Sequence, residues 1–403
     1  MNNRPIDPAT NMLLSSTASA VAVDGVDGWR VHTQALRDKL DGNDVIVLSV
    51  GDPDFDTPAT ITERAIEALR DGDTHYTPAG GIRPLVEAIA ASESKRLGWD
   101  VAPRNVVVCA GAQNALYTAM RCIVDRGDEV ILLSPPYTMF EGVVAAAGGE
   151  VKLVPLRREN GFQADLDSLR AAVSPNTRAI LLNSPHNPSG AIASREVLEG
   201  IAELCIENGI WLISDEVYAD LCFEAAFTSP SGLEGMRERT IIIRSLSKSH
   251  AMTGWRLGWI VAPRAICEPA RDYLNHALYG SPGFLQHGAV AAFTEEVPEV
   301  DEMKRVYRER RDMFYDTLAG LNSLDCIKPQ SGIFCIVGID KLGLPAMEFA
   351  ERLYAEEGVS VLPGEAFGAE HSDWVRISLC QPDEVLREAV TRMARFVGTL
   401  SPA

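Results

Sequence analysis

Seven short apolar runs recur along the chain, separated by longer segments in which polar and apolar positions are mixed. The runs cover residues 106–109, 130–133, 151–156, 179–183, 211–214, 241–244 and 257–261. Most lack the alternation of period two that marks a strand with one face in water, so they are typical of strands buried on both faces. Amphipathic segments such as 194–208 lie between several runs and suit crossover helices. The pattern predicts an α/β fold with a mostly parallel, seven-stranded sheet.

The pattern changes near residue 300. Residues 300–321 form a charged helical pattern, and short strand-like runs follow at 332–337, 359–362 and 374–378. These features indicate a smaller α+β unit. A further run at 43–50 precedes the large sheet in sequence, and we expect it to join the smaller unit.

The length of the chain also favours two units. Its 403 residues exceed the roughly 250–300 at which a single core stops growing. We predict a large domain over residues 56–299 and a small C-terminal domain over residues 300–403. The N-terminal segment of residues 1–55 should join the small domain.

Composition and charge exclude several classes of function. The chain is 46% hydrophobic and 23% charged, and its 37 Lys and Arg against 56 Asp and Glu give a formal net charge of −19. A chain this acidic repels nucleic acid and anionic lipid, so we expect neither as a partner. No stretch reaches the roughly 18 uncharged apolar residues of a membrane helix. The apolar segment 12–23 follows Asp7 rather than a basic cluster, which argues against a signal peptide.

The eight cysteines are scattered along the chain without a CxxC pair, and several lie in apolar runs. This spacing is typical of reduced core residues and not of a disulfide framework or a zinc site. We therefore expect a cytoplasmic protein and no metal.

Polar residues follow four of the predicted strands, where ligands bind in open α/β sheets. Gly111 follows the first run and opens a helical pattern, whose free N–H groups suit a phosphate. Asn187 follows the fourth run between two prolines that fix a rigid turn. Asp215 follows the fifth run, where a carboxylate is costly unless a cation neutralises it, although capping of the next helix is an equal alternative.

The fourth place carries the clearest chemistry. After the run 241–244 comes SLSKSHAMTGWRLG, with Lys248 set among small hydroxyl residues and Arg256 eight positions later. An amine attacks a carbonyl when burial or a nearby cation lowers its pKa. Arg256, Ser245 and Ser247 can supply that cation and donors for an anion.

This fourteen-residue string resembles the pyridoxal phosphate (PLP) attachment signature of class I and II aminotransferases, which have fold type I. The other three loops follow in the order and spacing of that family, and the resemblance covers residues 45–380. It implies a large PLP-binding domain with a smaller α+β domain. It also implies transfer of an amino group from an L-amino acid to a 2-oxo acid by ping-pong half reactions.

The resemblance implies a role for each matching residue. Lys248 would carry the cofactor as an internal Schiff base and move the α-proton of the substrate. Asp215 would pair with the pyridinium nitrogen so that the ring acts as an electron sink. Tyr218 and Asn187 would donate hydrogen bonds to the ring oxygen, and Tyr137 would stack on the ring.

The resemblance also assigns the phosphate and the substrate. The phosphate would be held by Gly111, Ala112, Gln113, Ser245, Ser247 and Arg256. Arg376 would clamp the substrate α-carboxylate with a fork of donors, helped by Gly51 and Asn187. Tyr76 matches a tyrosine that reaches the cofactor phosphate of the neighbouring subunit, which implies a homodimer whose sites are completed across the interface.

The sequence departs from the aspartate-type enzymes at one position. Those enzymes have a histidine three residues after the stacking aromatic, where this chain has Phe140, so we expect Asp215 to act without that histidine. His186 and His250 flank the site in sequence, and we expect both to be structural.

The strings SVGDPDFDTP, LNSPHNPSGA and LYGSP are most similar to arginine–pyruvate transaminases. If the donor is arginine, an acidic group should meet the guanidinium, since an unpaired buried cation is costly. The candidates are Asp24, Asp27, Asp52 and Asp54, for each of which turn formation or capping is the alternative. Trp29 could form a wall of the pocket.

Two other functions stay open. A β-lyase on the same fold would use the same carboxylate clamp at Arg376. A regulator with a PLP-sensing domain would need a DNA-binding domain ahead of it, whereas only about 45 residues precede the matched region and they lack a basic helix-turn-helix pattern.

Overall fold

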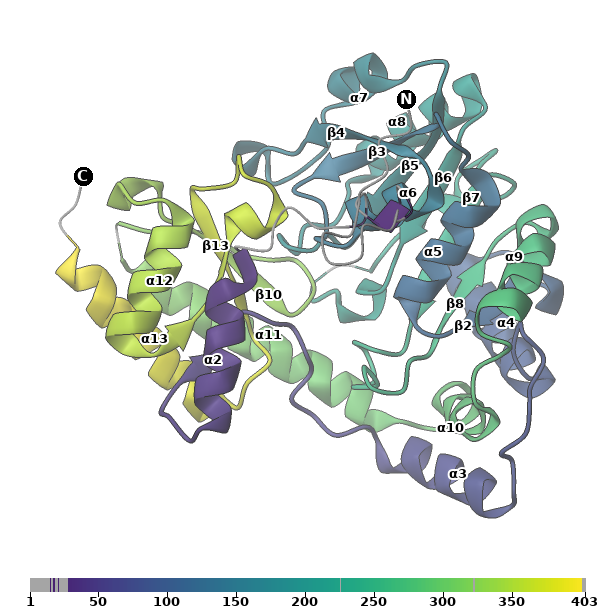
Figure 1. Ribbon diagram of the computed structural model, residues 1–403, viewed down its shortest axis with the longest axis horizontal. Helices are drawn as coiled ribbons and strands as arrows, with labels where there is room; N and C mark the ends of the chain where they lie inside the picture. Colours follow the sequence, from purple (N-terminus) through teal and green to yellow (C-terminus); the bar gives the residue numbers. More distant parts are fainter. Residues whose placement is uncertain are drawn as a thin grey trace.

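The structure is a computed structural model that describes residues 28–400 except Ala225 and Asn322, together with Ser15, Thr17, Ala18 and Val21. Its centre is a seven-stranded sheet with the order β2-β8-β7-β6-β5-β3-β4 (Figure 1). The strands are β2 (Val106–Cys109), β3 (Glu129–Ser134), β4 (Glu150–Pro155), β5 (Thr177–Asn183), β6 (Trp211–Asp215), β7 (Thr240–Ser245) and β8 (Gly258–Val261). Only β8 pairs antiparallel with its neighbours. The prediction of a mostly parallel, seven-stranded sheet is confirmed.

Helices cover both faces of this sheet, which explains why its strands are continuously apolar. Alternate residues of β3 enter different cores: Val130 and Leu132 pack in one, Ile131 and Leu133 in the other. The first face carries α5 (Ala112–Ile123), α6 (Phe140–Ala147) and α9 (Arg264–Ala277), and the second carries α7 (Leu166–Ala172) and α8 (Arg195–Asn208). A third core joins β2, β7 and β8 to α3 (Ala59–Arg70), α4 (Arg83–Leu97) and α10 (Gly283–Thr294).

The predicted crossover helix shows how the sequence sets a helix boundary. Ser194 caps α8, because its hydroxyl accepts a hydrogen bond from the backbone N–H of Val197 at 3.2 Å. Gly209 ends the helix with a positive φ of 63°, which glycine adopts without strain.

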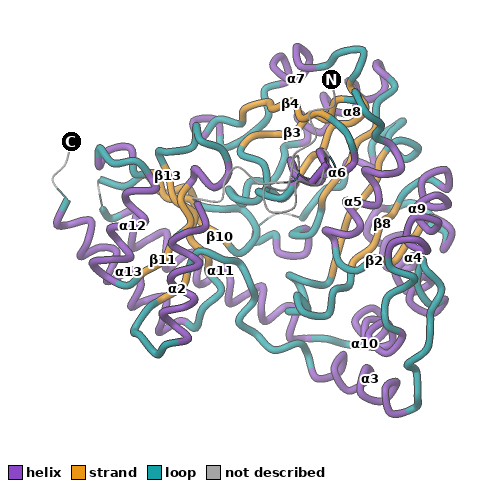
Figure 2. The backbone as a smooth tube through the Cα atoms, viewed as in Figure 1, coloured by secondary structure: helices purple, strands orange, loops and turns teal. Residues whose placement is uncertain are grey.

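The smaller α+β unit has a four-stranded antiparallel sheet with the order β12-β13-β10-β9. Its strands are β9 (Asp325–Ile327), β10 (Phe334–Gly338), β12 (Leu362–Pro363) and β13 (Trp374–Ser378). The helices around it are α2 (Arg30–Leu40), α11 (Pro298–Ala319), α12 (Ala346–Glu357) and α13 (Asp383–Thr399) (Figure 2). The N-terminal run contributes β1 (Ile46–Val47), which pairs parallel with β11 (Val359–Ser360).

Two details of the smaller unit differ from the sequence prediction. The run 359–362 is not one strand, because β11 and β12 belong to different sheets. The run 43–50 contains only two strand residues, and β9 was not predicted. Short strands leave too few positions for a periodic pattern. The domain boundaries at residues 55 and 299 stay a prediction.

None of the helices in the described part of the chain is long and apolar enough to cross a membrane. The eight cysteines are free, and six of them are buried.

Candidate active site

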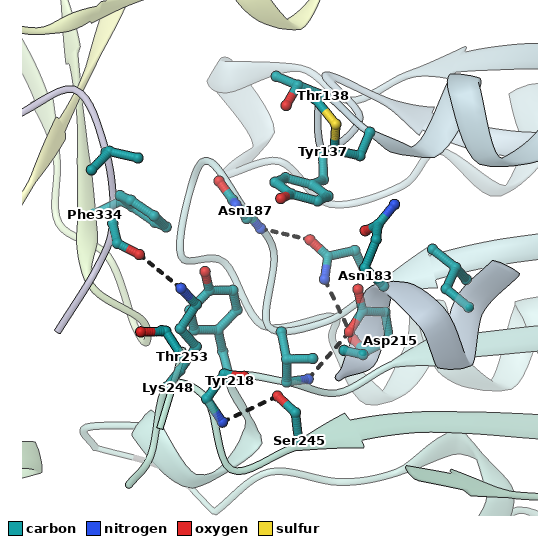
Figure 3. Close-up of a pocket in the computed structure, with 18 of the residues that line it drawn as sticks. Tyr137, Thr138, Asn183, Asn187, Asp215, Tyr218, Ser245, Lys248, Thr253 and Phe334 are labelled. Atoms are coloured by element: carbon teal, nitrogen blue, oxygen red, sulfur yellow. Dashed lines mark hydrogen bonds between the residues drawn. The ribbon is translucent and has the colours of Figure 1, made fainter. Parts of the chain in front are cut away.

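A cavity of about 340 Å³ lies where the carboxyl ends of the large parallel strands meet the small sheet (Figure 3). Asn183, Asp215 and Ser245 end three neighbouring strands of the large sheet and line it. Phe334 and Arg376 reach it from β10 and β13 of the small sheet. The site is therefore built by both sheets, at the strand edge where the sequence predicted it.

The Asp215 carboxyl is buried, with 7% of the residue exposed. Burial raises its pKa to about 7, and the neighbouring charge of Glu216 adds to the rise. The backbone N–H of Val217 opposes this rise by donating to Oδ1 at 3.3 Å. A cation placed against Asp215 would keep the carboxyl ionised at neutral pH.

The Lys248 amine lies across the cavity from Asn187 and donates to the carbonyl oxygen of Gly51 at 2.7 Å (Figure 3). Burial lowers the pKa of this amine, and the positive charges of Arg376 and Arg256 lower it further. A larger share of the amine is therefore neutral and nucleophilic than for an exposed lysine.

The N-terminus of α5 opens toward the cavity. Gly111 precedes it with a φ of 85°, and no side chain caps the helix. This φ favours glycine, and a Cβ at Gly111 would also lie 2.4 Å from Nη2 of Arg256 and displace its guanidinium. Arg256 itself donates to the carbonyl oxygens of Thr253 at 2.8 Å and Ala110 at 3.4 Å. Uncapped N–H groups, a guanidinium and the adjacent serine hydroxyls together form a site for an anion such as phosphate.

Arg376 is 3% exposed, yet it forms no ion pair within the described part of the chain. It donates to Oδ1 of Asn187 at 3.1 Å and to the carbonyl oxygen of Ser49 at 2.7 Å. Its guanidinium lies over the ring of Phe334, 4.0 Å from the centroid. Its Nε has no hydrogen-bond partner in the part of the chain that the structure describes, and burial lowers the pKa of Arg376 to about 10. A ligand carboxylate would satisfy this buried cation.

Two tyrosines complete the wall of the cavity. Tyr137 packs edge to face against Phe140 with ring centroids 5.3 Å apart, and Tyr218 is 5% exposed. Burial raises the pKa of both phenols, so both are neutral hydrogen-bond donors near pH 7.

Most of the predicted site residues share this one cavity. They are Gly51, Ala112, Gln113, Tyr137, Asn187, Asp215, Tyr218, Ser245, Ser247, Lys248, Arg256 and Arg376, and Trp29 also lines it. Gly111 starts α5 but does not line the cavity. Tyr76 lies elsewhere: it is 85% exposed and packs against Tyr279 beside a second cavity.

The two flanking histidines do not line the cavity. His186 is buried between the Ser189 hydroxyl and the Pro135 carbonyl oxygen, and burial lowers its pKa to about 4. His250 contacts the Ser249 hydroxyl, and burial likewise lowers its pKa to about 4. Both positions fit the structural role expected for them.

Two of the acidic candidates for a guanidinium are already engaged. Asp54 forms a two-pronged ion pair with Arg310 at 2.7 and 2.9 Å. Asp52 is exposed and accepts a hydrogen bond from Thr253, a residue of the cavity wall, at 2.7 Å. The candidates Asp24 and Asp27 lie outside the described residues.

The sequence interpretation missed several residues of the cavity wall. They are Val50, Leu116, Thr138, Met139, Asn183, Val217, Thr253 and Phe334. Asn183 could have been found, because a polar residue ends an apolar run there. Phe334 carries no such signal, since an aromatic residue in a buried strand is ordinary core.

The sequence of the chain matches the family described as aminotransferase class I and II over residues 43–393. The chain belongs to that family. It is 45% identical to the arginine–pyruvate transaminase of Pseudomonas aeruginosa, over 96% of this chain and 99% of that protein. It is 35% identical to the aspartate aminotransferase of Geobacillus stearothermophilus, over 91% of this chain and 95% of that protein.

Solved structures agree with this assignment. A single mutant of the aspartate aminotransferase of Thermus thermophilus superposes with a TM-score of 0.89 and 34% identity, covering 95% of this chain and 99% of that one. The aminotransferase therefore has fold type I, as expected from the sequence.

Proposed function

We propose that this aminotransferase uses PLP, bound through Lys248. It moves the amino group of an L-amino acid to a 2-oxo acid such as pyruvate, and arginine is the candidate donor. One observation carries the proposal: the Lys248 amine, a buried carboxyl and a buried arginine that has no ion pair among the described residues converge on one cavity beside an uncapped helix N-terminus. The 45% identical arginine–pyruvate transaminase supports arginine and pyruvate as the substrates to test first.

The residues of the cavity fit PLP on chemical grounds. The N-terminus of α5 with Arg256, Ser245 and Ser247 suits the phosphate. Asp215, whose carboxyl has no cationic partner among the described residues, suits the protonated ring nitrogen. Tyr137 offers an aromatic face to the ring. When bound, PLP supplies an electron sink for the bond that breaks at the substrate α-carbon.

The remaining chemistry belongs to side chains of this chain. Lys248 would hold the cofactor through Nζ, and its amine, once released, would take the α-proton of the substrate. Its lowered pKa makes the neutral amine available for that proton. Tyr218 and Asn187 line the same cavity and would donate hydrogen bonds to the ring oxygen of the cofactor.

Arg376 holds the α-carboxylate of the substrate. Its two Nη atoms now donate to Asn187 and Ser49, and a carboxylate offers two oxygens to the same planar fork. Gly51 lies against this position, and a Cβ on it would come within 2.2 Å of the Phe334 ring, so the close approach depends on glycine.

We further propose a homodimer in which Tyr76 of each subunit reaches the cofactor phosphate of the other. The 85% exposure of Tyr76 and its distance from the cavity of its own subunit support this proposal. Ultracentrifugation and activity at falling protein concentration should show loss of activity with dissociation. An active monomer would overturn the proposal of a shared site.

We also propose a cytoplasmic location, supported by the eight free cysteines.

The decisive experiment for the function is a pair of half reactions. Purified yellow protein should lose its colour on addition of the amino donor alone and regain it with pyruvate. A panel of donors then ranks arginine, alanine and aromatic amino acids by kcat/KM. Rates with alanine or aromatic donors far above the rate with arginine would contradict the arginine assignment. Release of ammonia without loss of colour would favour the β-lyase alternative instead.

A further inference from the structure

The start of helix α2 contacts the cavity through Trp29, and His32 lies behind Trp29 on the same face of the helix. Trp29 directly precedes the helix and lines the cavity, and His32 follows three positions later. Residues three apart lie on the same side of a helix. The two rings pack edge to face with centroids 5.4 Å apart, so His32 supports the Trp29 ring.

The other side of the His32 ring contacts Ser49. Nδ1 lies 2.8 Å from the Ser49 hydroxyl, and the Ser360 hydroxyl donates to that same oxygen at 3.0 Å. Ser49 and Ser360 are fully buried. Because Ser49 accepts from Ser360, its own hydroxyl proton is free to point to Nδ1, which then accepts it as a neutral imidazole. Burial and the nearby charge of Arg376 lower the pKa of His32, which favours the same neutral form.

Ser49 in turn supports the carboxylate clamp. Its carbonyl oxygen accepts from Nη2 of Arg376 at 2.7 Å. Ser49 is therefore fixed through its side chain by His32 and Ser360, and it fixes Arg376 through its backbone. The guanidinium of Arg376 is held by hydrogen bonds to Asn187 and Ser49, so its position is sensitive to a shift of either acceptor.

We propose that His32, on α2, is a positioning residue for substrate binding. Its ring holds Trp29 in the cavity wall, and its contact with Ser49 holds the Arg376 guanidinium that binds the carboxylate. The inference rests on the proposed function for the identity of the substrate carboxylate. Under this proposal, α2 and the hydrogen bonds that link Ser360, Ser49 and His32 contribute to substrate affinity. They do not take part in the chemical step at Lys248.

The test compares four variants of the cofactor-loaded protein. His32→Leu keeps an apolar bulk and removes the acceptor, and Ser49→Ala removes the hydroxyl that His32 contacts. His32→Asn keeps an acceptor close to the position of Nδ1. Gln34→Ala is the matched control, because Gln34 lies on the same helix but is exposed and bonds to Asp38 at 2.8 Å. Thermal unfolding identifies any variant that is misfolded.

Two readouts are measured for each variant. The first is the split between KM and kcat for the amino donor with pyruvate. The second is the dissociation constant, by calorimetry, of two carboxylates that lack the reacting amine: propanoate and 5-guanidinopentanoate. The second readout does not depend on turnover, so it separates failure of this inference from failure of the proposed function.

We expect His32→Leu and Ser49→Ala to raise KM and both dissociation constants about three- to tenfold, with kcat changed less than about twofold. His32→Asn should restore most of that loss, and Gln34→Ala should match the unmodified protein. Unchanged propanoate binding in His32→Leu would overturn the inference. So would equal losses in His32→Leu and His32→Asn, because packing alone would then explain them.

Discussion

Two sets of buried charges lie side by side in the aminotransferase, and they differ in how their charges are neutralised. In the first set, Arg244 donates to Glu93 at 3.0 Å and to Asp220 at 2.5 Å. Arg96 joins Glu93 to Glu216 with contacts of 2.7 and 2.8 Å. In the second set, Arg376, Lys248 and Asp215 line the cavity, and none has an ion-pair partner among the described residues.

The two buried arginines show the consequence. Arg244 is 4% exposed and Arg376 is 3% exposed, so burial opposes both charges equally. For Arg244 the carboxylates of Asp220 and Glu93 outweigh burial and hold its pKa above the ordinary value. For Arg376 burial dominates and lowers the pKa to about 10. A buried cation without an anion costs free energy, so its retention indicates a ligand that supplies the anion.

The two sets are neighbours in sequence. Asp215 belongs to the cavity and Glu216 to the ion network; Ser245 belongs to the cavity and Arg244 to the network. Successive side chains along an extended strand point to opposite sides. The ends of β6 and β7 therefore each contribute one residue to the stability of the fold and one to the chemistry of the site.

The largest effect should come from Lys248→Ala. We expect turnover to fall on the order of 10⁴-fold, because both the attachment of the cofactor and the proton transfer are lost. Unfolding free energy should not fall, since the hydrogen bond of Lys248 within the described chain goes to a neutral carbonyl oxygen. Steady-state rates and chemical denaturation measure the two quantities. Near-native turnover would contradict the role of Lys248.

The matched pair Arg244→Met and Arg376→Met sharpens the comparison. Arg244→Met leaves Glu93 buried without that cation, so we expect unfolding free energy to drop by about 3–5 kcal/mol. Arg376→Met removes an unpaired buried charge and should leave stability unchanged or raise it. Urea denaturation of the cofactor-free proteins decides the point. Equal destabilisation by the two substitutions would break the distinction between the sets.

Asp215 should give the cofactor-free protein a specific pH dependence. Its pKa is about 7 in the folded chain and about 4 when exposed, so between these values the folded state binds more protons than the unfolded state. Unfolding free energy should therefore fall as pH rises from about 4 to about 7, by on the order of 3 kcal/mol from this group. The difference between the unmodified protein and Asp215→Asn isolates it. A difference that does not change with pH would refute the assignment.

Among the changes to the two charge sets, the smallest effect is expected for Arg376→Lys, which keeps the charge but loses the planar fork. We expect the affinity for the donor to fall about 10- to 100-fold. Arginine and alanine should lose the same factor, because both present the same α-carboxylate. Inhibition constants and KM values for the two donors provide the measurement. A loss confined to arginine would place Arg376 at the side chain instead.

The sequence predicted the strands of the large sheet well, because continuous apolar runs bounded by turns leave few alternatives. The run 106–109 coincides with β2, and 374–378 coincides with β13. The loops that follow the strands predicted the cavity, since parallel strands bring their carboxyl ends to one edge. The short strand β9 and the division of the run 359–362 into β11 and β12 lay below what periodicity resolves.

The ion network and the contacts of α2 could not be predicted. Glu93 lies 151 positions from Arg244 in a helix where an acidic residue is usually solvated. His32 lies 17 positions from Ser49, and nothing in either segment indicates that they meet. Such pairs depend on how packed elements meet in space, which no local pattern records.

Reduction of the purified holoprotein with borohydride, followed by digestion and mass spectrometry, tests the central claim most directly. The reagent fixes the bond between the cofactor and its lysine. We predict that the peptide containing Lys248 carries the mass of the reduced cofactor. Cofactor mass on another lysine, or on none, would contradict the account.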